Sequence, residues 1–395
     1  MAGILDLSGK EKLNILGLMS GTSCDGLDLA LIEISGLGSK TEFNVIACES
    51  LAYSVQTREA LLSFLRRPDH TLKEISQLNF YMARLWADQV EQFFRNKNLK
   101  RFSIDLIASH GQTIWHQPFK DLFFETQTTS TLQLGDPSVL ANYLQIPVVG
   151  DFRVADMALD GQGAPLIPYF DWVFFSRFKK NIMAVNIGGI SNITFVPADG
   201  DFSKLKAFDC GPGNMLIDGA MLHLFKKPFD TEGNLARSGK LSEKLIEQLK
   251  SSDPFIEQMP PKSTGREQYN ETFLNNILLF AGKNNISAED TIHTLSYYTA
   301  ESIYKNYCMF IDAHQPDELA VGGGGSKNSF IMEKLSDLFN ASAIKTTAQY
   351  GLDEDFKEAI GFAILANETI HGKPSNVPAI SGASRPAILG KICLV

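Results

Sequence analysis

The chain has 395 residues and a formal net charge of -9, with 44% hydrophobic and 21% charged residues. This composition is typical of a soluble globular protein with a large core, and the length suggests about two to three domains. The acidic balance argues against general binding to nucleic acid or to anionic membranes. No stretch is apolar enough to span a bilayer, and the N-terminal residues lack the apolar core of a signal peptide. Five scattered cysteines, none in a C-x-x-C pair, favour a reducing cytoplasm over a disulfide framework or a zinc site.

The segment from Leu13 to Ile34 is predicted to form two strands around a small polar turn, Ser20–Gly26. Glycine in such a turn lets a ligand approach the backbone closely, and successive N–H groups can bind an anion. The same residue types also form ordinary hairpin turns. This segment alone therefore leaves both a phosphate site and a plain turn open.

Hydrophobic periodicity then predicts a strand over 43–55, helices over 58–65 and 72–94, a buried strand over 103–108, strands over 131–135 and 146–150, and a helix over 137–144. The polar residues His110 and Gln112 directly follow the buried strand. Because ligands in open α/β sheets lie at the carboxyl ends of strands, these side chains are candidates for lining a site. A polar loop without a binding role is the alternative.

Two acids, an arginine and a glycine-bearing loop follow the strand that ends at Gly150. A carboxylate at this place, Asp151 or Asp156, can act as a general base. The alternative is that either aspartate caps the segment that follows it.

The second half begins with the same design of strand, small glycine turn and strand, over Ile182–Val196. A further strand over 205–208 runs into the polar segment Asp209–Asn214, and a helix over 215–225 follows. Two glycine turns of one kind, one in each half of the chain, indicate an internal duplication.

Helices are predicted over 241–255, 270–283, 287–311 and 330–339, with a strand over 318–321. This strand runs into Gly322–Gly325, and four glycines between a strand and a helix allow a purine and its ribose to lie against bare backbone. The acids Asp353–Asp355 open the last long helix, which Gly372 and Pro374 end.

The chain has neither a Walker A sequence, nor an intact G-x-G-x-x-G motif, nor a G-x-S-x-G elbow, so those loops cannot bind a nucleotide here. The chain instead resembles the actin-like ATPase and sugar-kinase superfamily. It shares two glycine hairpins, a carboxylate after a strand and a four-glycine loop. The resemblance implies an α/β fold of two duplicated actin-like (ribonuclease H-like) domains that close over ATP in a central cleft. We expect the domains to cover 1–180 and 181–395, with the last helix packing back on the first.

Within that superfamily the chain resembles the 1,6-anhydro-N-acetylmuramic acid kinase family. The resemblance covers residues 14–392 in family order and rests on the segments Gly17–Asp28, Ser109–Thr113, Asp151–Asp156, Gly161–Pro168, Asn186–Asn192, Asp209–Asn214 and Gly382–Pro386. Asp160 departs from the family, which has glycine there, and residues 1–12 look like an extra tail.

The resemblance implies an enzyme that opens the 1,6-anhydro bond of the sugar with water and phosphorylates its 6-oxygen from ATP. The products are N-acetylmuramic acid 6-phosphate and ADP, in the recycling of cell-wall peptidoglycan. A base must activate the water, and we expect Asp156 in this role, with Asp151 as the second candidate. A carboxylate suits a centre that becomes positively charged as its bond breaks.

The remaining site residues follow from the same resemblance. The phosphates are expected against Gly21, Thr22, Ser23, Cys24, Asp25, Gly26, Leu27 and Asp28 in the first turn, and against Asn186, Gly188, Gly189, Ser191 and Asn192 in the second. Adenosine is expected against Gly322, Gly323, Gly324 and Gly325, and the sugar against His110, Gln112 and Glu358. Asp25 is expected to orient Mg²⁺ through water, since this ion keeps much of its hydration shell. A homodimer is expected from the resemblance only, without nucleic-acid or membrane partners.

Two other functions stay open at this point. A kinase for levoglucosan, which lacks the N-acetyl and lactyl groups, shares the resemblance. A non-enzymatic sugar sensor or a chaperone-type ATPase would need a DNA-binding or a peptide-binding segment beyond the two domains.

Overall fold

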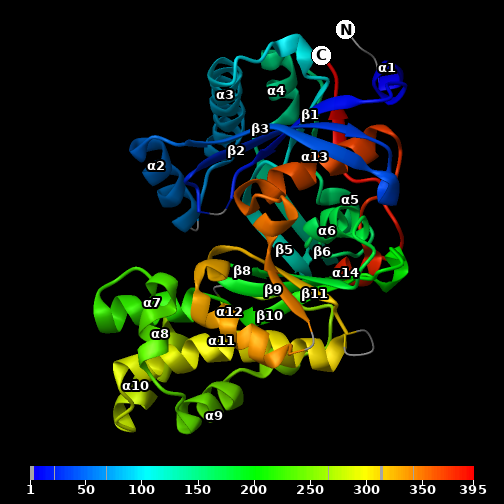
Figure 1. Cartoon of the computed structure of the whole chain (residues 1–395). Coiled ribbons are helices and arrows are strands. Elements are labelled where there is room, and N and C mark those ends of the chain that lie inside the picture. Colours follow the sequence, from blue (N-terminus) through cyan, green and yellow to red (C-terminus); the bar gives the residue numbers. More distant parts are fainter. Residues whose placement is uncertain (1–3, 22, 68, 266, 312–314, 341) are drawn as a thin grey trace. The chain divides into compact units, whose positions relative to one another are not determined.

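The structure is a computed structural model that describes residues 4–21, 23–67, 69–265, 267–311, 315–340 and 342–395 (Figure 1). Its contacts divide the chain into two compact units. The first unit holds the residues up to Val173 together with Asp355–Val395, and the second unit is Phe174–Glu354. The sequence predicts a boundary at 180/181 with the last helix packing back on the first domain; in the structure the chain passes from the first unit to the second at 173/174 and returns at 354/355.

The first unit contains eight strands and several helices of very different length. Its strands are β1 (Leu13–Met19), β2 (Gly26–Ser35), β3 (Glu42–Ala52), β4 (Leu106–Ser109), β5 (Gln112–Phe123), β6 (Thr126–Leu134), β7 (Val148–Gly150) and β13 (Lys391–Cys393). Its helices are α1 (Ile4–Ser8), α2 (Val55–Arg66), α3 (Leu72–Asn96), α4 (Pro137–Leu144), α5 (Val154–Met157), α13 (Lys357–Ile370) and α14 (Pro378–Ser381), with 3₁₀ turns η1 (Gly38–Lys40) and η2 (Arg101–Ser103). Two further elements, α6 (Ile167–Ser176) and η8 (Glu354–Phe356), lie at the two junctions with the second unit.

Six of these strands form one sheet in the order β13-β7-β4-β1-β2-β3. The strands β1, β2 and β3 form an antiparallel meander, while β4 and β7 continue from β1 in parallel. The carboxyl ends of β1, β4 and β7 therefore lie at one edge of the sheet, where ligands of open α/β sheets bind.

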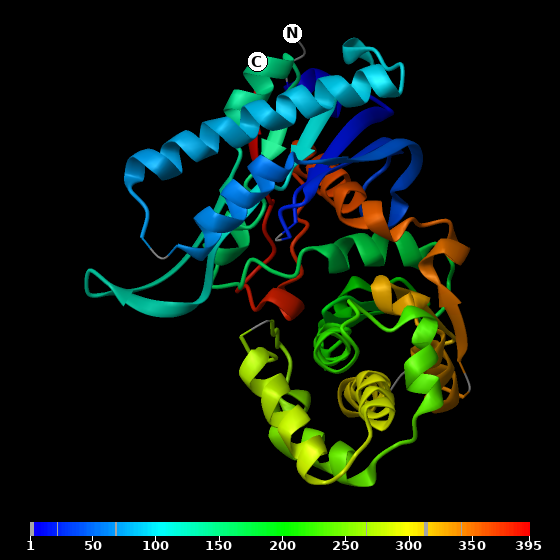
Figure 2. The ribbon, with the colours of Figure 1, turned by 90° about the vertical axis from the view of Figure 1, so that its left-hand side faces the viewer.

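Helices cover the two faces of this sheet (Figure 2). The helix α3 begins at a capping box formed by Thr71 and Glu74, and its buried side packs with α4 onto one face. The helix α13 contacts β1, β2 and β4. Its backbone comes so close to β1 that a Cβ atom on Gly17 would lie 1.9 Å from the carbonyl oxygen of Ala359.

The second unit contains five strands, six helices and five 3₁₀ turns among the residues that the structure describes. Its strands are β8 (Ile182–Ile187), β9 (Ile190–Val196), β10 (Lys206–Pro212), β11 (Glu318–Gly322) and β12 (Ala343–Thr346). Its helices are α7 (Met215–Phe225), α8 (Asn234–Ser238), α9 (Glu243–Ser252), α10 (Glu271–Lys283), α11 (Ala288–Phe310) and α12 (Ser329–Leu338). The 3₁₀ turns are η3 (Phe202–Lys204), η4 (Thr231–Gly233), η5 (Pro254–Glu257), η6 (Gly324–Lys327) and η7 (Thr347–Tyr350).

The sheet of the second unit has the order β10-β9-β8-β11-β12 and repeats the topology of the first. Its first three strands form an antiparallel meander, and β11 and β12 continue from β8 in parallel. The first sheet has the same order and the same strand directions in β3-β2-β1-β4-β7. The predicted α/β fold and internal duplication are therefore confirmed. The long helix α11 lies against α7, α8, α9 and α12 (Figure 2). Its apolar side chains form a core with one face of this sheet.

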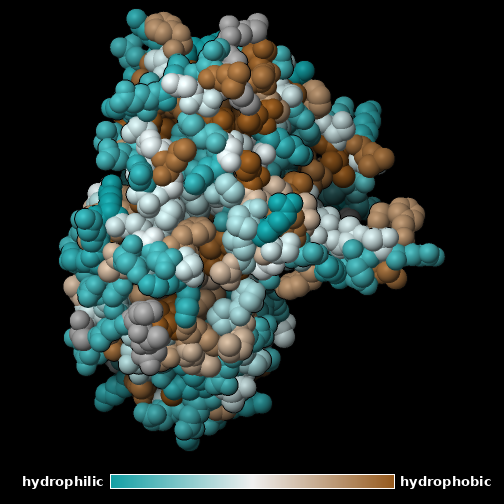
Figure 3. Space-filling model, turned by 90° about the vertical axis from the view of Figure 1, so that its right-hand side faces the viewer, coloured by the Kyte–Doolittle hydropathy of each residue, from teal (hydrophilic) through white to brown (hydrophobic). Residues whose placement is uncertain are grey.

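The hairpin of β5 and β6 is predicted only in part, because the strand expected over 131–135 overlaps the end of β6 whereas β5 is not predicted. It forms a separate two-stranded sheet, and most of its residues are exposed on both faces, so it shows no alternation of polar and apolar residues. The hairpin is visible as a projection in Figure 3, and exposed apolar side chains lie along it. They are Trp115, Phe119, Leu122, Phe123, Phe124 and Leu132. Within the described part of the chain, no helix has both the length and the hydropathy of a membrane span.

The contact of β1 with α13 gives a first prediction. We expect Gly17→Ala to lower the melting temperature, because overpacking of this kind costs about 1 to 3 kcal/mol. The control is Gly282→Ala in α10, where a Cβ atom meets nothing within 4 Å and helix propensity should raise stability slightly. Thermal unfolding of the whole chain measures both, and equal melting temperatures for the two variants would contradict the packing described here.

Candidate active site

The turn between β1 and β2 presents backbone and two exposed side chains. Cys24 has a φ of 51° and its N–H donates to the carbonyl of Gly21. Its side chain and that of Leu27 are buried in the core, so only their backbone can meet a ligand. Ser23 and Asp25 are exposed, and the Ser23 hydroxyl donates to Asp25 Oδ1 at 2.9 Å. Thr22, which the sequence places in this turn, lies outside the described residues.

A buried polar network lies beneath this turn. Ser20 Oγ lies 2.7 Å from Gln112 Oε1 and 2.8 Å from the Tyr53 hydroxyl, to which the Trp86 indole also donates. Gln112 in turn donates to the carbonyl of Gly21. Burial raises the pKa of Tyr53 to about 12, so its hydroxyl stays neutral. Gln112 is therefore a support for the turn, and its expected contact with the sugar stays a prediction.

Asp28 is a half-buried carboxylate at the start of β2. Burial raises its pKa, and the charges of Asp25 and Asp355 raise it further, while a hydrogen bond from Ser50 opposes the shift. Among the described residues, no group of three or more His, Cys, Asp or Glu side chains is placed to hold a metal ion. A metal here would take most of its ligands from water and phosphate, and this fits Mg²⁺.

A second polar group lies at the ends of β4 and β7. His110 is 3% exposed, and its Nε2 accepts hydrogen bonds from Nε and Nη2 of Arg153 at 3.1 and 2.9 Å. Because a guanidinium can only donate, the imidazole proton must sit on Nδ1. Burial, with Arg153 second, lowers the pKa of His110, so the ring is neutral. Glu358, exposed in the first turn of α13, acts electrostatically on Arg153. The sequence reasoning named His110 and Glu358 but missed Arg153, although it belongs to a motif quoted above.

Asp156 is fully buried and its carboxylate is closed in by hydrogen bonds. Oδ2 accepts from the N–H of Gly163 at 2.8 Å, and Oδ1 accepts from Asn376 Nδ2 and Ser381 Oγ at 2.8 and 2.7 Å. A Cβ atom on Gly161 would lie 2.2 Å from Oδ2. These contacts connect the loop after α5 to the segment around α14, and they leave no open side from which a water could be activated.

Two neighbouring aspartates have backbone conformations that favour glycine. Asp151 has a φ of 56° and forms an ion pair with Lys391 at 2.8 Å. Asp160 has a φ of 64°, in the left-handed region, and is paired with Lys120. Glycine adopts this conformation without strain, so the glycine that the resemblance places at this position suits the backbone here.

In the second unit, the glycine turn between β8 and β9 packs against the end of β10. The N–H groups of Gly213 and Asn214 donate to the carbonyls of Gly189 and Gly188, both at 2.8 Å. A Cβ atom on Gly213 would lie 2.3 Å from the Gly188 oxygen. Ser191 is buried and its hydroxyl donates to the carbonyl of Gly211. Asn186 and Asn192 face each other across the two strands.

Three of the four glycines that run from the end of β11 into η6 serve close packing within the protein. A Cβ atom on Gly323, whose φ is 74°, would lie 2.5 Å from Asn186 Oδ1, and one on Gly325 would lie 2.3 Å from Ile187. Gly322 is similarly close to Glu354, whereas a Cβ atom on Gly324 has no neighbour nearer than 3.5 Å. The glycines therefore bring η6 against the end of β8, and the adenosine contact stays a prediction.

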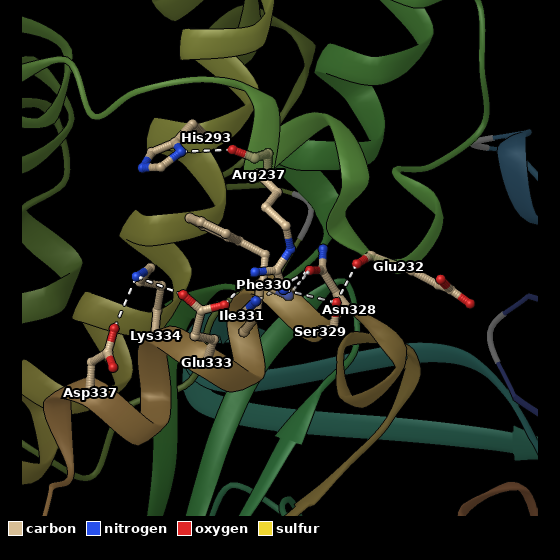
Figure 4. A network of polar contacts seen from close by, with 11 residues as sticks. Glu232, Arg237, His293, Asn328, Ser329, Phe330, Ile331, Glu333, Lys334 and Asp337 are labelled. Atoms are coloured by element: carbon tan, nitrogen blue, oxygen red, sulfur yellow. Dashed lines mark hydrogen bonds and ion pairs between the residues drawn. The ribbon is translucent and has the colours of Figure 1, made fainter.

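Hydrogen bonds fix the helix that follows these glycines (Figure 4). Asn328 Oδ1 caps α12 by accepting from the N–H groups of Phe330 and Ile331. Ser329 Oγ donates to the carbonyl of Glu232 and accepts from Arg237, which also pairs with Glu333. The start of α12 is thus held to η4 and α8.

Asp209 in β10 is a half-buried carboxylate of the second unit with a raised pKa. A register shift between Asp209 and Gly211 interrupts the pairing with β9. Oδ2 accepts from the N–H of Thr264 at 2.8 Å, and Oδ1 has no hydrogen bond to any described residue. Burial raises the pKa of Asp209 from 3.8 to about 6, against the opposing effects of the Thr264 N–H and Lys262. The sequence analysis includes this residue in the segment Asp209–Asn214 but gives it no role. Its position, an acid at the end of a predicted strand and beside a glycine turn, could have indicated one.

Comparisons with known proteins agree along the whole chain. The family model of anhydro-N-acetylmuramic acid kinase matches residues 13–394. Proteins of that name from Caldanaerobacter subterraneus and Salinibacter ruber are each 37% identical, over 100% and 99% of both chains. The one from Bacillus thuringiensis is 39% identical over 96% of this chain and 98% of its own. The chain therefore belongs to the anhydro-N-acetylmuramic acid kinase family.

Proposed function

We propose that the chain phosphorylates 1,6-anhydro-N-acetylmuramic acid at its 6-oxygen, with ATP as donor and water opening the anhydro bond. Family membership over residues 13–394 supports the reaction. The observation that carries the chemistry is Asp209, a half-buried carboxylate with one oxygen free of protein hydrogen bonds among the described residues and a pKa near 6.

The reaction joins two bond changes at one sugar. A water oxygen attacks the anomeric carbon and loses a proton, the bond from that carbon to the 6-oxygen breaks, and the 6-oxygen takes the γ-phosphoryl group while ADP leaves. A base with a pKa near 6 is ionised at neutral pH and still accepts a proton readily. Asp209 meets this requirement, and Oδ1 is the atom that takes the proton.

The role of base thus moves from Asp156 to Asp209. Both oxygens of Asp156 already accept hydrogen bonds from the protein, so protonation would break contacts that hold the loop. Asp156 acts instead by fixing the loop whose Gly163 carbonyl accepts a hydrogen bond from Arg153.

The phosphates of ATP meet the backbone N–H groups of the two glycine turns, since phosphoryl transfer depends on positioning and electrostatics. Asp25 and Asp28 would hold Mg²⁺ through water, and the ion would supply positive charge to the phosphates. In this proposal, Gly322–Gly325 contact the adenosine of ATP, and His110 and Glu358 contact the sugar. The proposed assembly is a homodimer.

Arg153 favours an acidic sugar over levoglucosan. Its guanidinium donates to His110 and to Gly163, and its remaining N–H groups have no hydrogen-bond partner among the described residues. The lactyl carboxylate of the muramic acid sugar is the kind of group that a guanidinium binds through two parallel hydrogen bonds. Levoglucosan offers no such carboxylate.

Incubation of the chain with the anhydrosugar, ATP and Mg²⁺ in oxygen-18 water tests the reaction. We expect one oxygen-18 at the anomeric hydroxyl of the phosphorylated product, because water supplies that oxygen, and equal amounts of ADP and phosphosugar. A parallel incubation with levoglucosan should give much slower turnover. Release of ADP without a phosphosugar, or an unlabelled product, would exclude coupled hydrolysis.

A pair of variants tests the base. We expect Asp209→Asn to lower turnover by about two to four orders of magnitude, because it removes the group that accepts the proton. Asp156→Asn should mainly lower the melting temperature, since its amide would point a donor at another donor, at a cost of about 1 to 3 kcal/mol. Steady-state rates per folded molecule and thermal unfolding are measured for both variants. Full turnover in Asp209→Asn would show that another residue is the base.

The pKa of Asp209 also predicts a change in stability. Its folded pKa of about 6 lies above the usual 3.8, so the native state binds more protons than the unfolded state between these values. Stability therefore falls as the pH rises through this window, and the full cost is present above pH 6. We expect Asp209→Asn to melt at a higher temperature than the wild type at pH 8, with a margin that shrinks towards pH 4. A margin independent of pH would contradict the raised pKa.

A further inference from the structure

We propose that Lys262 is a positioning residue for Asp209: its buried ammonium anchors the segment that holds the aspartate and stabilises the negative charge of the carboxylate. The inference rests on the role of Asp209 proposed above and extends it to a buried group beside it.

Lys262 has an unusual environment for a lysine. It is 7% exposed, and its ammonium donates to the carbonyls of Phe255 and Ile256 at 3.2 and 2.9 Å. The ammonium also lies 4.8, 5.0 and 5.8 Å from the ring centroids of Phe255, Phe310 and Phe208. No carboxylate forms an ion pair with it among the described residues. An apolar side chain of the same length would fill this cage at a lower cost in desolvation, so the charge calls for an explanation.

The backbone next to Lys262 contacts Asp209 at two points. The N–H of Asp209 donates to the carbonyl of Lys262 at 3.3 Å, and the N–H of Thr264 donates to Asp209 Oδ2 at 2.8 Å. The anchored side chain fixes one end of this short segment on η5. A shift of the segment would therefore move or break the hydrogen bond that stabilises the ionised carboxylate.

Lys262 also acts on Asp209 through its positive charge, because the other groups around this carboxylate are negative or neutral. Glu267 raises the pKa of Asp209, and the buried groups Cys210, Tyr269 and Asp253 lie in the same cluster, with Tyr298 of α11 bonded to Asp253. None of these groups carries a positive charge. Lys262 lowers the pKa of Asp209, and among the described groups that act on this carboxylate it is the one with a positive charge. Burial lowers the pKa of Lys262 itself to about 8, so most of the ammonium is still protonated at neutral pH.

Three variants separate the two effects. Lys262→Met keeps the length of the side chain and removes both the charge and the anchoring hydrogen bonds. Lys262→Gln removes the charge and keeps an N–H donor for the carbonyls. The matched control is Lys305→Met, because Lys305 is partly exposed and pairs with Glu257 at the end of the same η5 turn.

Two readouts are measured for each full-length variant: the pH dependence of kcat/KM for the anhydrosugar, and the carbon-13 NMR titration of the Asp209 carboxyl, assigned with Asp209→Asn. We expect Lys262→Met to move the acid limb of the rate profile and the NMR titration upward together by about one pH unit. Lys262→Gln should show the same shift with a smaller loss of kcat. Lys305→Met should match the wild type in both.

The outcomes distinguish this inference from the proposed function. An unchanged titration of Asp209 in Lys262→Met and Lys262→Gln overturns the inference, even where kcat or the melting temperature falls. Full activity of Asp209→Asn overturns the assignment of Asp209 as the base. The titration of the Asp209 carboxyl in the Lys262 variants still tests the effect of Lys262. Where Lys262→Met does not fold, Lys262→Gln provides the same two readouts with the same deciding result.

Discussion

Close approach of backbone to backbone is the constraint on which both units depend. In the first unit, α13 lies on β1 at a distance that leaves no space for a side chain on Gly17. In the second, the start of α7 lies against the turn after β8, and Gly213 has no space for a side chain either. These contacts fix the helices at the strand ends that carry the polar residues. Glycine at these positions is thus a requirement of packing, which in turn shapes the edge where a ligand is bound.

The two aspartates that follow strands show how one side-chain type takes different roles in different surroundings. Asp156 is fully buried, and its three hydrogen bonds make it a connector between two segments of the first unit. Asp209 has a single hydrogen bond to the protein and keeps one oxygen free among the described residues. Burial with full hydrogen bonding gives a structural carboxylate, whereas burial with incomplete hydrogen bonding gives one that is ready to take a proton.

Strong periodicity explains what could be predicted from the sequence. The helices α4 and α7 have the predicted bounds, and the two meanders were predicted by their apolar runs and glycine turns. The hairpin of β5 and β6 was predicted only at the end of β6, because the rest of its strands has no buried face to produce a pattern. The distinction between Asp156 and Asp209 depends on partners more than 50 residues away in each case, and motif spacing does not record such contacts.

The return of the chain to the first unit has a consequence for how the protein forms during synthesis. The second unit is one continuous stretch, Phe174–Glu354, whereas the first lacks α13 and β13 until the segment after Glu354 has been made. A ribosome therefore releases all of the second unit before the sheet of the first has its edge strand and its covering helix. Asp156 is part of this dependence, because Asn376 and Ser381 belong to that late segment. A nascent chain that stops short of them leaves Oδ1 of Asp156 without both of its side-chain donors, and only the bond from Gly163 to Oδ2 remains.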